Sequence, residues 1–251
     1  MPEIIFLSII QGVTEFIPVS SSAHLILLSN YLNFNNQNLT LDISLHLGSL
    51  LAIIFYFKKD LLNLVDNKNL FIKIIISSIP VMFFGFLLIS LNLMEHLRSY
   101  EIIGWSTIIF GVLLYYSDLT KVNKKIKKDF GYSSALYIGF IQVLSLIPGV
   151  SRSGITITGG RLLNFSRLDS AKISFLVSIP TLTIISLYNI QNLIMGKNFE
   201  ISKMNFVGVL LSFLFSYLTI KFFLNYIKKF SLTVFVIYRI FLGMIILLYV
   251  Y

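Results

Sequence analysis

Cysteine is absent from this chain of 251 residues, which excludes disulfide bonds, thiol nucleophiles and cysteine-ligated metal sites. Charged residues are also scarce: they make up 12% of the sequence, whereas a soluble domain usually carries about 25%. The N-terminus has no basic stretch leading to a small-residue cleavage site, so we expect no cleaved signal peptide. Apolar residues instead form 56% of the chain, and its mean hydropathy of +0.85 is typical of an integral membrane protein.

The few charges are mostly positive, with 20 basic against 11 acidic residues and a net charge of +9. A basic protein can bind nucleic acid. In a membrane protein, however, lysine and arginine usually mark cytoplasmic loops and contact anionic lipid headgroups. We therefore predict membrane lipids as partners and no binding to nucleic acid.

The apolar residues gather in six segments that approach the roughly 20 residues a membrane-spanning helix needs. They are Ile43–Phe57, Phe71–Leu91, Ile102–Ser117, Ile173–Gln191, Phe206–Leu224 and Leu232–Tyr251. The sequence thus predicts an all-α, polytopic membrane protein that forms a single membrane domain over residues 1–251.

One further stretch, Ile10–Phe34, is repeated 131 residues later as Ile141–Phe165. Nine of the 25 aligned positions are identical without a gap, and each copy has a proline just before a serine cluster. The chain therefore divides into two related halves, at about residues 1–120 and 131–251.

Pro18 and Pro148 break each repeated stretch into two short apolar runs, because proline removes a backbone donor and clashes with the preceding turn. Each run has about 14 residues, or roughly 21 Å as helix, which is too short to cross a bilayer. We therefore predict two re-entrant helical hairpins. Three spans separate them, so the halves have inverted topologies, and such repeats place a polar site between them near mid-membrane.

This topology sorts the basic residues onto two faces. One face carries Lys58, Lys59, Lys68, Lys121, Lys124, Lys125, Lys127, Lys128, Arg161, Arg167, Lys172, Lys221, Lys228 and Lys229. The other carries Arg98, Lys197 and Lys203. The positive-inside rule makes the first face cytoplasmic and predicts both termini outside the cytoplasm.

The first hairpin carries an acid and a cluster of hydroxyl groups. Gln11 and Glu15 share one helical face, and a carboxylate inside a membrane is costly unless it is paired or binds a cation. Glu15 could cap a neighbouring group, act as a general base or bind a divalent cation. Ser20, Ser21 and Ser22 follow, and capping of the next helix explains one of them.

His24 lies three and four residues after Ser21 and Ser20, on their side of the helix. Serine and histidine together offer a nucleophile and a proton carrier. The helix N-terminus behind the serines also attracts anions, because it carries free N–H groups and partial positive charge. We therefore favour a functional role for His24 over a structural one.

The second hairpin repeats this geometry and adds a cation. Arg152 offers a planar fork that suits phosphate oxygens, and it is also a candidate counter-ion for Glu15. Gly149 and Gly154 allow close approach of the backbone, and Thr156 lies one turn after Arg152. Because phosphoryl transfer needs positioning and charge neutralisation above all, a phosphoryl group fits this combination best.

At these residues the sequence resembles the undecaprenyl-diphosphate phosphatases, bacterial membrane enzymes linked to bacitracin resistance. The family signatures stand here as Gln11-Gly12-Val13-Thr14-Glu15-Phe16-Ile17-Pro18-Val19-Ser20-Ser21-Ser22-Ala23-His24 and Pro148-Gly149-Val150-Ser151-Arg152-Ser153-Gly154-Ile155-Thr156. The resemblance covers essentially the whole chain. It implies a bacterial inner-membrane enzyme that removes the terminal phosphate from a C55 polyprenyl diphosphate and so recycles the carrier lipid for cell-wall synthesis.

The resemblance also implies roles for individual residues. The expected catalytic residues are Glu15, Ser21, His24 and Arg152, and the expected substrate contacts are Ser20, Ser22, Ser151, Ser153, Thr156 and Gly149. Glu15 and Gln11 would bind a divalent cation such as Mg²⁺ or Ca²⁺, although many relatives have glutamate at position 11, which leaves Glu15 as the main anionic ligand. The sequence does not choose between Ser21, His24 and an activated water as the nucleophile.

Two other classes of function remain as alternatives. A transporter or flippase for an anionic polyprenyl lipid would need Arg152 but has no use for a serine–histidine pair. A structural membrane subunit would leave the polar cluster unexplained. The oligomeric state is not fixed by the sequence, and a homodimer is compatible with it.

Overall fold

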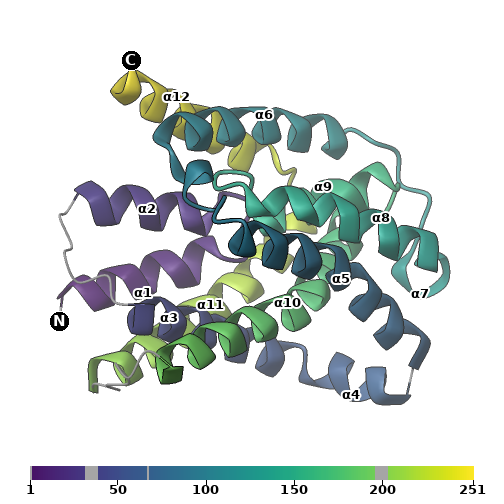
Figure 1. Cartoon of the computed structure of the whole chain (residues 1–251). Helices are drawn as coiled ribbons and strands as arrows, with labels where there is room; N and C mark the ends of the chain where they lie inside the picture. Colours follow the sequence, from purple (N-terminus) through teal and green to yellow (C-terminus); the bar gives the residue numbers. More distant parts are fainter. Residues whose placement is uncertain (1, 32–38, 67, 196–202) are drawn as a thin grey trace.

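The computed structural model describes residues 2–31, 39–66, 68–195 and 203–251, which form twelve α-helices and two short 3-10 helices (Figure 1). In chain order the α-helices are α1 (Pro2–Thr14), α2 (Ser21–Tyr31), α3 (Leu39–Tyr56), α4 (Lys58–Asp66), α5 (Lys68–Ser90), α6 (Tyr100–Asp118), α7 (Ile126–Asp129), α8 (Tyr132–Val143), α9 (Arg152–Leu162), α10 (Arg167–Met195), α11 (Lys203–Ile227) and α12 (Thr233–Val250). The 3-10 helices are η1 (His96–Arg98) and η2 (Leu144–Leu146). This confirms the predicted all-α class for the described residues.

Four of these helices are long and apolar enough to cross a membrane, which makes the chain a multi-pass membrane protein. They are α5, α10 over Arg167–Gln191, α11 over Asn205–Ile227, and α12. The predicted segment Ile43–Phe57 matches the shorter apolar helix α3, and Ile102–Ser117 lies inside α6. Neither of these two helices is among the four that are long and apolar enough to cross a membrane. The apolar part of α3 is limited to Leu41–Tyr56, and α6 has acidic residues near both ends.

Both repeated stretches form a pair of short helices joined by a turn at the proline. Helices α1 and α2 are joined by residues 15–20, and α8 and α9 by residues 144–151. The predicted breaks at Pro18 and Pro148 are therefore confirmed. The four helices on either side of the two turns have 11 to 13 residues each. The matching residues Leu32, Asn33 and Phe34 of the first copy lie outside the described residues.

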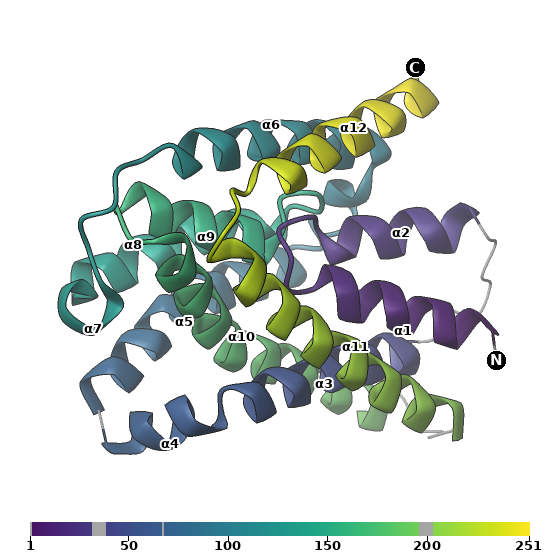
Figure 2. The same cartoon turned by 180° about the vertical axis from the view of Figure 1, so that it is seen from behind.

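The two helical pairs point toward each other from opposite ends of the molecule. Helices α1 and α2 lie at the end that holds both chain termini, whereas α8 and α9 lie at the end with α4 and α7 (Figures 1 and 2). Helix α1 packs on α11, and α8 packs on α5. The two turns consequently meet in the interior of the helical bundle.

Close packing between helices fixes the first turn. A Cβ atom at Gly12 would lie 2.6 Å from Cβ of Phe215, and one at Gly48 would lie 2.4 Å from the carbonyl oxygen of Val209, so α1 and α3 both approach α11 closely. Phe16, in the turn itself, is fully buried, and its ring meets the edge of Phe175 at a centroid distance of 5.4 Å. This anchor sets the direction of the neighbouring Glu15.

A buried carboxylate joins several helix ends at the other end of the bundle. Asp118 accepts two hydrogen bonds from Arg167, at 2.6 and 3.0 Å, and one of 3.0 Å from the backbone N–H of Leu232. Arg161 donates to the carbonyl oxygens of Asp118, at 3.0 Å, and of Thr120, at 2.6 Å. One acidic side chain thus holds the end of α6 against the starts of α10 and α12.

Candidate active site

The tips of the two hairpins contact each other directly. The hydroxyl of Ser153 donates to the carbonyl oxygen of Ile17 at 2.9 Å, and the backbone N–H of Gly149 donates to Oγ of Ser20 at 3.2 Å. Each contact joins residues that lie more than 120 positions apart in the chain. The site is therefore assembled from both halves of the protein.

The two turns share one unusual backbone geometry. Ser20 and Ser151, which are equivalent in the repeat, have φ angles of 75° and 70°, in the left-handed region that few residues other than glycine adopt. Each then caps the following helix: Oγ of Ser151 accepts from the N–H of Gly154 at 3.1 Å, and Oγ of Ser20 from that of Ala23 at 3.4 Å. The N-termini of α9 and α2 therefore begin at the place where the tips meet.

Glu15 is the centre of the polar cluster. Its Oε1 forms a salt bridge of 2.9 Å with Nη2 of Arg152, and its Oε2 accepts hydrogen bonds from Ser21 at 2.7 Å and from Gln11 at 3.1 Å. Both charged side chains are largely buried, at 6% exposed for Glu15 and 12% for Arg152. The structure thus brings Gln11, Glu15, Ser21 and Arg152 together as a single network.

A cavity of about 360 Å³ opens beside this network, with Glu15, Ser20, Ser21, Ser151 and Arg152 in its wall. The Nη1 atom of Arg152 is buried and has no hydrogen-bond partner among the described residues. A buried donor without a partner is costly, so this nitrogen is suited to an incoming oxyanion. One arm of the predicted phosphate-binding arginine therefore binds Glu15, while the other has no partner among the described residues.

Three ionisable side chains that the sequence analysis did not assign to the site also line this cavity. They are Arg98, Asp42 and His46. The Nδ1 atom of His46 lies 2.8 Å from the carbonyl oxygen of Asp42, which places the ring proton on Nδ1. Because Arg98 belongs to η1, the cavity wall extends toward the loop between α5 and α6.

His24 faces a different environment from Ser21. Its Nδ1 lies 2.7 Å from the carbonyl oxygen of Ser20, and its Nε2 lies 2.5 Å from the hydroxyl of Tyr238. The ring lines a separate apolar groove of about 470 Å³ with Leu27 and Leu242. His24 is close to the serine cluster as expected, but it contacts the backbone of Ser20 and not a serine hydroxyl. Both of its ring nitrogens already have a hydrogen-bond partner.

The remaining predicted contacts divide between the cavity and the packing around it. Ser22 is exposed and lines the cavity, whereas Thr156 is buried and lies 2.6 Å from Oγ of Ser174 in α10. Ser153 bonds the Ile17 carbonyl across the tips. Gly149 allows close approach as predicted, but to α6: a Cβ there would lie 2.1 Å from Oγ of Ser106.

Oxygen ligands for a divalent cation are few. The described residues contain no group of three or more histidine, aspartate or glutamate side chains that could hold a metal on their own. The amide oxygen of Gln11, however, is buried without a partner among the described residues, while the amide nitrogen of the same side chain donates to the Glu15 carboxylate. These two side chains fit a hard cation that takes its other ligands from substrate oxygens and water, as Mg²⁺ commonly does.

Arg239 is the main residue that the sequence analysis missed. It is fully buried, and its guanidinium group donates to the carbonyl oxygens of Gly149 and Val150, each at 3.0 Å, and of Thr107 at 3.2 Å. A signal was available, because Arg239 is the one charged residue in the apolar segment Leu232–Tyr251. An ionisable residue within such a segment is a candidate for function.

Comparison with known proteins gives one consistent result. The family model for "Bacitracin resistance protein BacA" matches residues 4–245 of this chain. An undecaprenyl-diphosphatase of Pelagibacter ubique is 50% identical over 99% of this chain and 97% of its own length. Proteins of the same name from Saccharophagus degradans and Campylobacter curvus are 41% and 40% identical, over 95% and 97% of this chain and 94% and 97% of their own lengths.

Proposed function

Because this chain belongs to the bacitracin resistance protein BacA family, we propose that it is an undecaprenyl-diphosphatase. The reaction converts undecaprenyl diphosphate into undecaprenyl phosphate and inorganic phosphate, and so recycles the carrier lipid for cell-wall synthesis. The observation that carries this proposal is the network of Glu15, Ser21 and Arg152 in the wall of one cavity. It combines a base, a hydroxyl nucleophile and an oxyanion ligand within hydrogen-bond reach.

Binding of the diphosphate rests on positive groups around the cavity. Nη1 of Arg152 donates to a phosphate oxygen, and the N-termini of α2 and α9 contribute partial positive charge from two directions. Arg98 adds a second cation at the cavity wall. These groups neutralise the charge that a diphosphate brings and that grows on the leaving phosphate.

The polyprenyl chain of the substrate would bind in a groove separate from the phosphate cavity. The apolar groove beside His24 is lined by Ile10, Leu27, Leu242 and Ile246, and hydrocarbon chains bury well against such side chains. His24 lines this groove, and its Nδ1 contacts the backbone of Ser20, a residue of the phosphate cavity. His24 is therefore positioned between the lipid chain and the diphosphate.

The chemical step follows from the hydrogen bond between Ser21 and Glu15. As Oγ of Ser21 attacks the terminal phosphorus, its proton passes to Oε2 of Glu15, and the bond to the bridging oxygen breaks to release undecaprenyl phosphate. Glu15 passes that proton to the departing undecaprenyl phosphate. It then takes a proton from an incoming water, whose oxygen attacks the phosphorus of the phosphoserine, and returns this proton to Oγ of Ser21 as the bond between Oγ and phosphorus breaks and inorganic phosphate leaves. Direct attack by water is the alternative, and it leaves no phosphoserine for rapid quenching and mass spectrometry to detect.

A divalent cation fits the same cluster. Glu15 and the free amide oxygen of Gln11 would hold it together with phosphate oxygens of the substrate. When bound, such an ion supplies charge neutralisation at the diphosphate. The pairing of Arg152 with Glu15 keeps the carboxylate oriented toward this position.

In the membrane, this proposal includes six spans, with α3 and α6 added to α5, α10, α11 and α12. It also includes two re-entrant hairpins in inverted halves. The opposed directions of the two hairpins support it (Figures 1 and 2). The lysine-rich end then lies in the cytoplasm of a bacterial inner membrane, and the cavity near Arg98 opens on the outer side, where both termini lie.

The test is phosphate release from the purified protein supplied with undecaprenyl diphosphate, with and without a chelator. Stoichiometric release that stops on chelation and resumes with added Mg²⁺ or Ca²⁺ is the expected result. A carrier of anionic polyprenyl lipids would bind the lipid without releasing phosphate, which would reject the enzyme assignment.

A further inference from the structure

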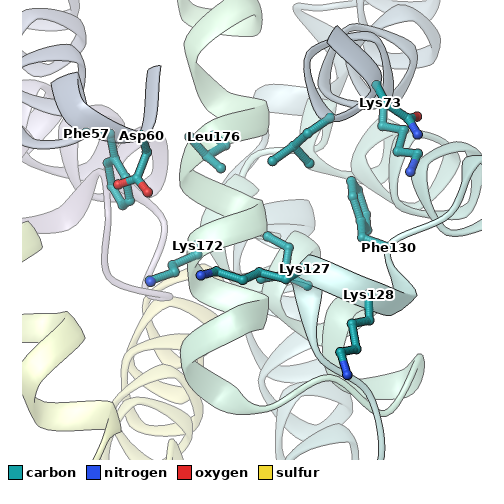
Figure 3. A pocket seen from close by; sticks show the side chains of 11 residues that line it. Phe57, Asp60, Lys73, Lys127, Lys128, Phe130, Lys172 and Leu176 are labelled. Atoms are coloured by element: carbon teal, nitrogen blue, oxygen red, sulfur yellow. The ribbon is translucent and has the colours of Figure 1, made fainter. Parts of the chain in front are cut away.

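A third pocket, of about 470 Å³ and distinct from the groove beside His24, lies at the end of the bundle that carries α4 and α7 (Figures 1 and 3). Its wall is built from the junction of α3 and α4, the start of α5, α7 and the start of α10. None of its lining residues belongs to the cavity around Glu15. It is therefore a separate site at the opposite end of the molecule from the termini.

Four lysines from three helices line this pocket. They are Lys73 of α5, Lys127 and Lys128 of α7, and Lys172 of α10. Figure 3 shows Lys127 and Lys172 extending in the same direction beside α10. Lys73 and Lys172 are half-buried, so part of their hydration is already lost. A concave cluster of this kind favours a compact anion.

The positive charge of this pocket is poorly compensated. Asp60 is the one acidic residue in its wall, and no salt bridge within the described part of the chain involves any of the four lysines. Asp129, next to Lys128, is engaged by the backbone N–H of Lys125 at 2.8 Å. The positive-inside rule accounts for lysines on this face, but not for their convergence on one hollow from three separate helices.

Apart from Asp60 and Asn69, the remaining residues of the wall are apolar. Phe57, Leu70, Phe130 and Leu176 line it together with the lysines, and Figure 3 shows Phe57, Phe130 and Leu176 around the same hollow. On α5, the pocket residue Leu70 is followed by Phe71 and Ile72, whose side chains are 51% and 45% exposed on the surface of a membrane-spanning helix. The lysines therefore lie where a headgroup would sit, beside a surface suited to acyl chains.

We propose that this pocket binds the phosphate headgroup of an anionic membrane lipid, with the acyl chains against the exposed apolar face of α5. Basic pockets between membrane-spanning helices on the cytoplasmic side bind such headgroups through charge and hydrogen bonds. A free phosphate ion offers the same charge but gains nothing from the apolar wall. The site is independent of the hydrolytic reaction proposed above.

The experiment compares thermal unfolding of the purified protein in neutral phosphatidylcholine nanodiscs with nanodiscs that contain increasing phosphatidylglycerol. The wild type should unfold at higher temperature as the anionic lipid increases. The double variant Lys127→Ala/Lys172→Ala should need about 30-fold more anionic lipid for the same shift, because each lysine near such lipid contributes about 1 kcal/mol. Lys228→Ala/Lys229→Ala is the matched control, since it removes two charges from the same end outside this pocket.

Three results would overturn the proposal. If both double variants lose the shift equally, the effect belongs to the overall surface charge. If inorganic phosphate alone stabilises the wild type as well as the lipid does, the pocket is a site for a free anion. If the wild type does not respond to phosphatidylglycerol, no lipid headgroup binds there.

Discussion

The guanidinium group of Arg239 donates a hydrogen bond of 3.0 Å to the carbonyl oxygen of Gly149, which joins the last helix to the tip of the second hairpin. The neighbouring carbonyl of Val150 accepts from the same nitrogen at 3.0 Å. In a planar trans peptide the N–H points away from the carbonyl, so this contact turns the N–H of Ser151 away from Arg239. Ser151 lines the cavity beside Glu15, so Arg239 fixes the backbone next to a residue of the proposed phosphate site.

Replacing Arg239 with methionine should lower both stability and activity. Three buried carbonyl oxygens would lose the guanidinium donor, at a cost of about 1–3 kcal/mol for each one left unsatisfied, although the Gly149 oxygen also accepts from Thr107 at 3.4 Å. Thermal unfolding in detergent and phosphate release would measure the two effects. Arg239→Lys should restore part of the stability but less of the activity, because an ammonium group cannot reach all three oxygens in the same plane. A methionine variant with normal turnover would remove Arg239 from the positioning of the tip.

Gly149→Ala should destabilise the protein by several kcal/mol or prevent its folding. The φ angle of Gly149 is +95°, and a Cβ there would lie 2.1 Å from Oγ of Ser106 and 2.7 Å from the carbonyl oxygen of Ile103. Gly131→Ala is the matched control, since a Cβ at that position meets no atom within 4 Å. Thermal unfolding of both variants gives the comparison, and equal midpoints would contradict this account of the tip.

Arg152→Lys should reduce phosphate release by about 100-fold, similar to the loss of one strong oxyanion donor in other enzymes. The guanidinium group uses one nitrogen for Glu15 and leaves another for the substrate, and a single ammonium group cannot reproduce that fork. Arg98→Lys keeps a charge at the cavity wall and should cost much less. Near-normal turnover of the Arg152→Lys variant would reject the proposal that Arg152 binds Glu15 and the substrate with separate nitrogens.

Glu15→Gln should abolish activity at every metal concentration, because an amide can neither accept the proton of Ser21 nor attract a cation as a carboxylate does. Phosphate release across a titration of Mg²⁺ measures this. Glu95→Gln removes an acid from the exposed loop before α6 and should behave as the wild type. A Glu15→Gln enzyme with full activity and ordinary metal dependence would exclude Glu15 from the mechanism.

The proposed topology can be tested with single cysteines, because the chain has none of its own. Glu95 and Asn123 are exposed in the loops at opposite ends of α6. An impermeant thiol reagent added to intact cells should label cysteine at 95 and spare cysteine at 123, with both labelled after the membrane is opened. The reverse pattern would place the lysine-rich end outside and invert the proposed orientation.

Local patterns in the sequence were sufficient for much of the fold and part of the site. Pro18 and Pro148 predicted the two turns, and the spacing of Gln11 and Glu15 predicted a side-chain pair that is present at 3.1 Å. The start of α10 was predicted too late, at Ile173 rather than Arg167. Its first turn is polar, and it is held by the Ser166 hydroxyl and by Asp118, which hydropathy does not detect.

The pairing of Arg152 with Glu15 was a candidate from the sequence and is confirmed at 2.9 Å, but most other contacts between distant segments were beyond reach of the sequence. Tyr238 meets His24 across 214 positions, and Arg239 meets Gly149 across 90. Neither pair has a local spacing that would indicate it, since the partner is chosen by how α12 packs against α6 and the hairpin tips. The charge of Arg239 marked the residue as unusual, but only packing could identify the carbonyl groups that it binds.

Every salt bridge of the described residues joins the first half of the chain to the second half. Glu15 and Asp118 come from the first half of the chain, and their partners Arg152, Arg161 and Arg167 come from the second. Two copies of the first half would therefore leave its acids without basic partners, because Ser21 stands at the repeat position of Arg152, and two copies of the second half would leave its arginines without acids. During synthesis the first half enters the membrane with two acids whose basic partners arrive only with the second half. A chain divided between Lys121 and Asp129 should therefore release phosphate only when both pieces are made together.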